Sequence, residues 1–307
     1  MTNRYEKVCF LCGSVDLSVR KYLKLDSDSL ARNVAYALPE VIGRLLSRAS
    51  RRFASAYAPV LTNKRYFDRS ACYCSNCRTG EVFPRFSDEE LSCYYRDFYW
   101  SNRDTIDGNH VPLDDRPNDK QLILTGDRID WIRARLPSLD SVIDFGAGDC
   151  AAAFVFRRSG LSVHVVDPSD RARDLAVRYH SSHSVDLELA PVVDLLYSAH
   201  SIEHVSDLMS TITKMLAHVP EGGHIFMETP NIGDVDVFHA LVHTPHTWML
   251  SCSTFEKLAE SLPLRIVAME SCGPMWRDGH RLVRSSERTD LRVLLQKTVR
   301  PLRGESK

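Results

Sequence analysis

Two pairs of cysteines in the N-terminal third of the chain have a spacing suited to binding a metal. Two residues separate Cys9 from Cys12, and two separate Cys74 from Cys77. A C-x2-C turn presents both sulfurs to one ion, and four thiolates complete a tetrahedral zinc site with no open position for catalysis. We therefore predict a structural zinc ion, with Cys72 as an alternative ligand and unrelated thiols as the competing interpretation.

A glycine-spaced turn lies near the middle of the chain, in residues 141–150, S-V-I-D-F-G-A-G-D-C. Its β-branched and aromatic residues predict a strand buried on both faces. Gly146 and Gly148 permit a tight turn in which the backbone approaches a ligand, and the alanine-rich residues 151–158 predict the next helix. Such a turn can also be a plain connector between strand and helix, so its meaning depends on residues further along the chain.

An acidic residue at the end of the next predicted strand indicates that the turn binds a nucleoside. Asp167 ends that strand and lies 23 residues after Asp144. An acid about 20 residues beyond a glycine turn can accept hydrogen bonds from both ribose hydroxyls of a bound adenosine. Asp186 and Glu188 are the candidates for contacting the adenine.

Histidine and acidic side chains that could transfer a proton gather in two later segments. They are His200, Glu203 and His204 at the end of a predicted strand, and His239, His243 and His246 in a later loop. We expect the general base of a group transfer among them. Residues 200–204 also match the H-x-x-E-H string of inverted zinc peptidases, but those ligands need a long helix and a distant acid.

Alternating strands and helices must position these side chains. Beyond the strand at residue 141, the predicted strands span residues 161–167, 185–189, 192–198, 224–229, 265–271 and 280–285. The predicted helices span residues 120–136, 151–158, 171–180 and 206–219. Regular alternation of strand and helix predicts an α/β fold with a parallel, doubly wound sheet and right-handed crossovers.

The central motifs together resemble those of class I S-adenosylmethionine (AdoMet) dependent methyltransferases. D-F-G-A-G at 144–148 is similar to the first motif of that family, residues 194–205 to its fourth-strand motif, and residues 216–231 to its fifth strand with the preceding helix. The resemblance covers about residues 122–285 and implies a Rossmann-like seven-stranded sheet with an antiparallel last strand. It implies that the cofactor contacts Asp144, Phe145, Gly146, Ala147, Gly148, Asp167, Pro168, Ser198 and Ala199.

One residue departs from the family pattern, because Cys150 stands where a third glycine is common. A nicotinamide-dependent Rossmann enzyme is the competing interpretation of the turn. The D-x-G-x-G pattern disfavours it, since dinucleotide-binding turns have G-x-G-x-x-G.

The N-terminal segment resembles the zinc-binding leader of a methyltransferase subgroup that acts on sugars, polysaccharide precursors and secondary metabolites. I-E-H-V at 202–205 and E-T-P-N at 228–231 resemble quinone-type O-methyltransferases. H-T-W-M-L-S-C-S-T-F-E-K-L at 246–258 resembles the family's pattern of a histidine, a short strand and a helix start, which favours His246 among the histidines of its loop. We expect O-methylation of a sugar, nucleotide sugar or secondary-metabolite precursor, with His200, Glu203, His204 and His246 as the catalytic residues. The alternatives are C- or N-methylation of a sugar, or an inactive zinc-ribbon adaptor with a methyltransferase-like fold.

The chain divides into three predicted parts. A zinc-ribbon-like segment (residues 1–100) carries a helical insert (residues 26–68), the methyltransferase domain comes next (residues 101–286), and a basic tail or docking helix (residues 287–307) ends the chain.

Charge and hydropathy narrow the choice of partners. Lys and Arg number 39 against 40 Asp and Glu, so the bulk charge favours neither a nucleic-acid nor an acidic partner. A small, sugar-like acceptor is what the resemblance implies. The arginines of the insert indicate a solvated face, a lid over an anionic substrate or peripheral contact with acidic lipid. We expect a cytoplasmic protein, because no segment reaches the roughly 18 to 20 apolar residues of a spanning helix and none resembles a signal peptide.

Overall fold

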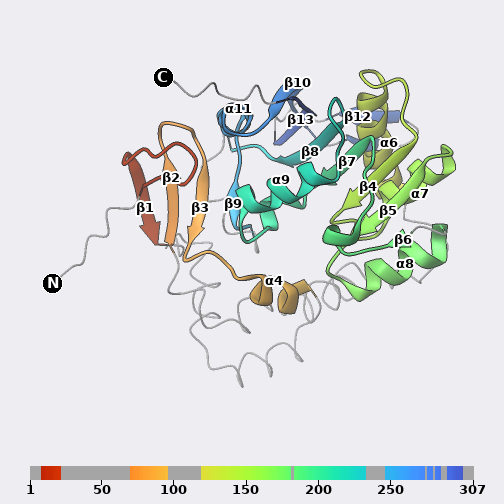
Figure 1. Ribbon diagram of the computed structural model, residues 1–307, viewed down its shortest axis with the longest axis horizontal. Coiled ribbons are helices and arrows are strands. Elements are labelled where there is room, and N and C mark those ends of the chain that lie inside the picture. The colour runs from red at the N-terminus through yellow and green to blue at the C-terminus, as the bar shows by residue number, and fades with distance from the viewer. Residues whose placement is uncertain are drawn as a thin grey trace.

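The computed structural model describes residues 8–21, 70–95, 119–180, 183–232, 246–273, 275–278, 281–284 and 289–299 (Figure 1). The insert predicted at residues 26–68 lies outside these ranges, as do His239 and His243. Predictions about them stay predictions. No helix among the described residues is both long and apolar enough to cross a membrane.

A mixed sheet forms the centre of the molecule, with the strand order β10-β13-β8-β7-β4-β5-β6. Its strands are β4 (Ser141–Phe145), β5 (Ser162–Val166), β6 (His183–Ser184), β7 (Leu195–Ala199), β8 (His224–Pro230), β10 (Leu264–Cys272) and β13 (Asp290–Lys297). Strands β4 to β8 run parallel to one another, and β13 runs antiparallel to both of its neighbours. The predicted α/β class with one antiparallel strand is therefore confirmed.

Helices cover both faces of this sheet (Figure 1). They are α6 (Asp119–Arg133), α7 (Ala151–Arg158), α8 (Asp170–His180), α9 (Leu208–Ala217) and α11 (Cys252–Ser261). Successive side chains of a strand point to opposite faces. In β8, Ile225 and Met227 accordingly pack in one core with Ile212 of α9, whereas Phe226 lies in a second core with Phe156 of α7.

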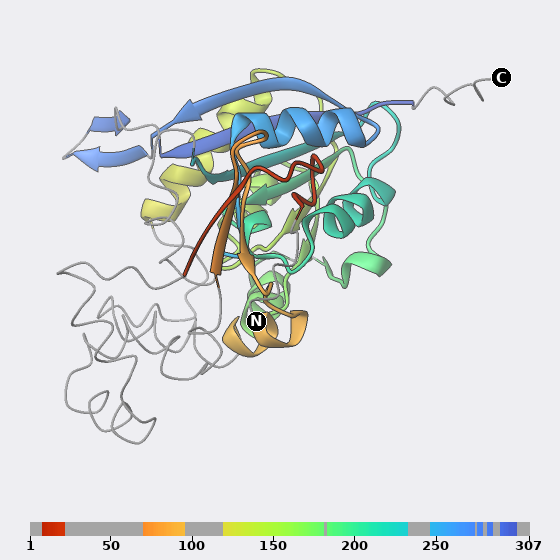
Figure 2. The same ribbon diagram turned by 90° about the vertical axis from the view of Figure 1, so that its left-hand side faces the viewer.

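The C-terminal strand differs from the prediction. Residues 290–297 form β13, between β8 and β10, so the prediction of a tail or docking helix at residues 287–307 is wrong there, and the domain boundary at residue 286 falls too early. The predicted run 280–285 is not the inserted strand either. Its β12 (Arg281–Arg284) pairs with β11 (Met275–Asp278) in a separate hairpin, which Figure 2 shows away from the sheet.

Ion pairing explains why the sequence does not reveal β13. The charge of Arg292 is typical of a solvated segment, but this residue is buried, and its guanidinium contacts carboxylates of Glu228 and Asp127.

A second difference lies at residues 185–189, where the sequence predicts a strand. Only His183 and Ser184 pair with β5, and Leu187–Leu189 form a 3-10 turn whose first side chain is buried.

A smaller antiparallel sheet joins the N-terminal segment to the rest of the chain. Its strands, in spatial order, are β1 (Leu17–Lys21), β2 (Ser70–Cys74), β3 (Gly80–Phe83) and β9 (Trp248–Met249). Because β9 comes from the loop before α11, the N-terminal segment is held by backbone pairing as well as by side chains.

Helix α4 (Asp88–Tyr94) comes after this sheet and begins at a capping box. The Ser87 amide donates to a Glu90 carboxylate oxygen (2.8 Å), and the Glu90 amide donates to the Ser87 hydroxyl (3.2 Å), so both donors at the start of the helix are satisfied.

Candidate active site

The glycine turn lies at the carboxyl end of β4, where ligands bind in open α/β sheets. Gly146 and Gly148 have φ angles of +72° and +56°, a conformation that favours glycine. A Cβ on Gly146 would overlap the Ser201 side chain, which comes from the loop after β7. The backbone amide of Gly148 donates to Asp167 at the end of β5 (2.9 Å), so the predicted ribose acid and the turn are in direct contact.

Two further side chains fix the start of α7 behind the turn. The carboxylate of Asp144 accepts a hydrogen bond from the Ala153 amide (3.1 Å), and burial raises the pKa of Asp144 to about 7. Cys150 has a φ of +58°, is fully buried, and places its thiol 3.3 Å from the Ala172 carbonyl oxygen. The cysteine that replaces the expected third glycine therefore points away from the turn and into the contact between α7 and α8.

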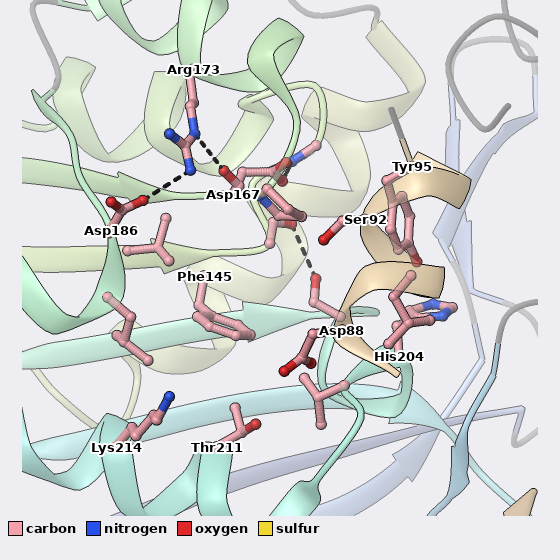
Figure 3. A pocket seen from close by; sticks show the side chains of 18 of the residues that line it. Asp88, Ser92, Tyr95, Phe145, Asp167, Arg173, Asp186, His204, Thr211 and Lys214 are labelled. Atoms are coloured by element: carbon pink, nitrogen blue, oxygen red, sulfur yellow. Dashed lines mark hydrogen bonds and ion pairs between the residues drawn. The ribbon is translucent and has the colours of Figure 1, made fainter. Parts of the chain in front are cut away.

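A cavity of about 480 Å³ opens on one side of the turn. Phe145, Asp167 and Pro168 line it, as the resemblance implies. Arg173 spans its far end and donates to the Asp167 carbonyl and the Asp186 carboxylate, at 2.9 Å each. Figure 3 shows Asp88, Ser92 and Tyr95 on the side of the cavity away from Arg173 and Asp186, so the N-terminal segment forms one wall of the cavity.

A second cavity, of about 400 Å³, opens on the other side of the turn. Of the residues implied as cofactor contacts, Asp144, Ala147 and Ala199 line it. Gly146, Gly148 and His200 line both cavities, so the two recesses meet at the glycine turn. Ser198 is buried within β7 and lines neither cavity.

An ionic network forms the floor of the second cavity, and sequence reasoning missed it. The buried carboxylate of Glu228 in β8 accepts from Arg128 of α6 (2.6 Å) and Arg292 of β13 (2.5 Å). Burial acts to raise the pKa of Glu228, but the charges of Arg128, His200 and Arg292 outweigh it and hold that pKa far below its usual range. An acid inside the apolar strand motif H-I-F-M-E-T-P was the only signal in the sequence.

His200 is held by the same network. Its φ is +52°, its amide donates to the Glu228 carbonyl (2.7 Å), and its Nε2 lies 3.2 Å from a Glu228 carboxylate oxygen. Burial acts to lower the pKa of His200, but the carboxylates of Glu203 and Glu228 outweigh it and raise this pKa to about 10. His200 is therefore an imidazolium at neutral pH, and it can donate a hydrogen bond but cannot act as a base.

Glu203, His204 and His246 form a cluster beside the first cavity, which we call the acceptor-side cluster. The Glu203 carboxylate is almost fully buried and lies 3.7 Å from His204 Nε2. Burial acts to raise the pKa of Glu203, but His200, His204 and His246 lower it to about 2. The His246 ring contacts the His204 ring edge-on at 4.7 Å. His204 lines the cavity next to Tyr95, with the two ring centroids 6.0 Å apart.

The structure thus brings together the four residues predicted to be catalytic. Three of them could also bind a metal ion together, because one potential ligand atom from each of Glu203, His204 and His246 lies within 4.8 Å of the other two.

The four predicted cysteine ligands also converge. The Sγ atoms of Cys9 and Cys77 lie 3.5 Å apart, and those of Cys12 and Cys74 lie 3.6 Å apart. Zinc–sulfur bonds of about 2.3 Å in a tetrahedron imply sulfur separations of about 3.8 Å, so the group fits zinc with small adjustments. Burial acts to raise the pKa of Cys12, but hydrogen bonds from the Ser14 amide and other donors lower it to about 7. Burial raises the pKa of Cys9 and of Cys77, so these two favour the thiol unless a cation is bound.

Comparison with known proteins places this fold among methyltransferases. No curated protein sequence matches the chain. The solved 1,6-didemethyltoxoflavin-N1-methyltransferase of Burkholderia thailandensis, with its bound substrate and S-adenosylhomocysteine, is 14% identical, and the match covers 75% of this chain and 96% of that one with a TM-score of 0.50. The N-methyltransferase NodS of Bradyrhizobium japonicum, solved with S-adenosylhomocysteine, is 17% identical over 62% of this chain and 93% of that one, with a TM-score of 0.44.

A family model described as a methyltransferase domain matches residues 119–298. The match spans more than half of the 307 residues and includes the glycine turn, the acceptor-side cluster and β13. The chain therefore belongs to this methyltransferase-domain family.

Proposed function

We propose that this protein transfers the methyl group of AdoMet to a hydroxyl oxygen of a sugar, a nucleotide sugar or a secondary-metabolite precursor. The observation that carries the proposal is the meeting of two cavities at the glycine turn, with Asp167 and His204 both lining the first of them. A cofactor with a nucleoside at one end and an amino acid at the other needs such a divided site.

The first cavity suits the adenosine half of AdoMet. Asp167 has both carboxylate oxygens anchored by backbone amides, of Gly148 and Ser169, which orients its remaining lone pairs toward ribose hydroxyls. Phe145 offers an apolar ring for the adenine, and Asp186 lies at the same end of the cavity, held by Arg173. The methionine half then extends past Gly146 toward the second cavity.

His204 is the residue that we assign as the base. It accepts the proton of the acceptor hydroxyl while that oxygen bonds to the methyl carbon and the carbon–sulfur bond breaks. The bound AdoMet supplies a methyl group on a positively charged sulfur, which leaves as a neutral thioether. The buried Glu203 carboxylate stabilises the positive charge that His204 gains. His200 is already protonated, so it cannot accept the proton of the acceptor hydroxyl.

Polar side chains around the first cavity support a hydroxylated acceptor. Asp88, Ser92 and Thr211 line it together with His204. Carbon and nitrogen acceptors remain the alternative chemistry, because a base in this position serves them equally. An inactive adaptor is the alternative of a different class.

Radiolabelled AdoMet incubated with a panel of nucleotide sugars tests the proposal. We expect label in one or more sugars with the wild-type protein, and a loss of about 10²- to 10⁴-fold with His204→Gln, the usual contribution of a general base. His218→Gln is the matched control, since this histidine bonds the Ala190 carbonyl away from both cavities. Cofactor binding without transfer to any acceptor, together with a co-purifying protein, would favour the adaptor.

We also propose that the four cysteines bind one structural zinc ion. Elemental analysis of the purified protein should give one zinc per chain, and Cys77→Ser should lose it together with stability. Cys72→Ser is the control, because Cys72 is buried in β2 but is not part of the converging group. Zinc loss in Cys72→Ser instead would assign the ligand role to Cys72, and two ions per chain would point to a second site at the acceptor-side cluster.

A further inference from the structure

Trp248 is the largest fully buried side chain of the described residues, and it lies between the acceptor-side cluster and the cysteines. Its indole Nε1 donates a 2.7 Å hydrogen bond to the backbone carbonyl of Val205. Val205 comes directly after His204, and both residues line the first cavity. The indole therefore holds the backbone next to the assigned base.

The indole also contacts the turn that carries Cys9 and Cys12. The Phe10 ring, which lies between Cys9 and Cys12 in the chain, is 4.5 Å from the Trp248 ring, centroid to centroid. Arg85 covers both rings, with its Cζ 4.4 Å from the Trp248 centroid and 5.1 Å from that of Phe10. The turn that carries Cys9 and Cys12 is thus connected to the indole by packed side chains.

A backbone path runs beside the side-chain path. Trp248 pairs with Glu81 between β9 and β3, and β3 begins shortly after Cys77. The Val82 amide donates to the Thr247 carbonyl, and the Thr247 amide donates to the Glu203 carbonyl, each at 2.9 Å. The carbonyls of Glu203 and Val205, the residues on either side of His204, are thus both bonded to the segment that holds Trp248.

The turn needs this external support. Residues Ile202–His204 form a single 3-10 turn, which is closed by a hydrogen bond from the His204 amide to the Ser201 carbonyl. So short a turn has little stability of its own. The position of the His204 ring therefore depends on the groups that bind its neighbours.

We propose that Trp248 is a positioning residue that fixes His204 through the Val205 carbonyl and makes its position depend on the metal held by the cysteine turn. The inference rests on the proposed function, because it gives His204 a role in the reaction. It goes further by assigning the N-terminal metal a role in the geometry of the acceptor side, beyond stabilising its own segment.

Histidine NMR spectra test this inference without an identified acceptor. Carbon-13-labelled imidazole signals of His204 and His246, assigned from single His→Gln variants, are recorded before and after a chelator removes the metal. In the wild type, we expect chelation to move the His204 signal while the signal of His218, remote from the cluster, stays in place. In Trp248→Phe, chelation should move the His204 signal less than half as far, because the link is already broken.

The matched control is Trp131→Phe. Trp131 is also buried, but its indole nitrogen has no hydrogen-bond partner among the described residues, and it lies on α6, far along the chain from the cysteine turn. This variant should behave as the wild type does. Equal movement of the His204 signal on chelation in wild type and Trp248→Phe would overturn the inference, as would no movement in the wild type.

A second variant covers the case in which Trp248→Phe does not fold or the chelated protein unfolds. Phe10→Leu, with the metal bound, reduces the contact with the indole from the other side and should displace the His204 signal while leaving that of His218. An unchanged His204 signal in Phe10→Leu would overturn the inference. Titration with S-adenosylhomocysteine reports the proposed function separately, since it depends on the glycine turn and Asp167.

Discussion

Three buried carboxylates in this site differ in their pKa because their neighbours differ. Asp144 accepts a hydrogen bond from a backbone amide, and burial raises its pKa to about 7. Glu203 lies among imidazoles, which lower its pKa to about 2 despite burial. Glu228 has two guanidinium partners and stays ionised throughout the physiological range. Glu203 and Glu228 therefore stay negatively charged at neutral pH, whereas Asp144, behind the glycine turn, can gain or lose a proton near pH 7.

The paired state of His200 should be visible in the pH dependence of stability. Its pKa in the folded protein is raised from 6.5 to about 10, so its contribution is full below about pH 6.5 and is lost as pH rises toward 10. The wild type should lose thermal stability across this interval, and His200→Gln should flatten that loss. Melting curves between pH 6 and 10 measure it.

The matched variant is His224→Gln. Burial lowers the pKa of His224, so its charge changes below 6.5 and the alkaline fall should remain in this variant. An alkaline fall of equal size in His200→Gln and the wild type would contradict the assignment of His200 as an imidazolium.

The cofactor contacts implied by the sequence, other than Ser198, line at least one of the two cavities, and the sequence could point to them because each stands in a short local motif. The ionic network could not be found in this way. Arg128 and Arg292 lie 100 and 64 residues from Glu228, and only the sheet brings the three together. The same limit applies to Trp248, whose partners Val205 and Phe10 belong to distant segments.

At the scale of elements, most strands and helices of the central domain could be predicted because their hydrophobic patterns are long and regular. The helix predicted at residues 151–158 has those bounds in the structure. Strand β13 could not be recognised, since a buried arginine interrupts its apolar run. The charge of Arg292 is matched inside the protein by Glu228 and Asp127, so its polarity says nothing about solvent exposure.

Truncation tests the position of β13. Ending the chain after Arg288 removes Leu291, Val293, Leu294 and Leu295, which are all fully buried. At about 1.5–3 kcal/mol for each side chain, the loss is comparable to the whole stability of a typical domain, so this variant should not fold.

Ending the chain after Val299 keeps every strand of the sheet and should leave the melting temperature within about 2 °C of the wild type. Circular dichroism of the two truncated proteins measures the difference. A folded protein that ends at Arg288 would contradict the assignment of β13 to the sheet.

At the scale of the whole molecule, two sheets share one functional site. The cysteine group and α4 come from the N-terminal segment, and β9 joins that segment to the central domain (Figure 1). The residue before β9, Thr247, bonds the Glu203 carbonyl of the acceptor-side cluster. The sequence indicated the two parts separately, from the cysteine spacing and from the glycine turn. It could not indicate their junction, because β9 has only two residues and pairs with β3, which is distant from it in the sequence.

The central claim is that the glycine turn binds AdoMet, and calorimetric titration with S-adenosylhomocysteine tests it most directly. The informative pair is Gly146→Ala and Gly160→Ala. Both glycines have a positive φ, so each substitution should cost roughly 1–2 kcal/mol of stability, but a Cβ on Gly146 overlaps Ser201 whereas one on Gly160 meets no atom within 4 Å. We predict binding by the wild type and by Gly160→Ala, and its loss in Gly146→Ala. The absence of binding in the wild type, or equal affinities in both variants, would contradict the claim.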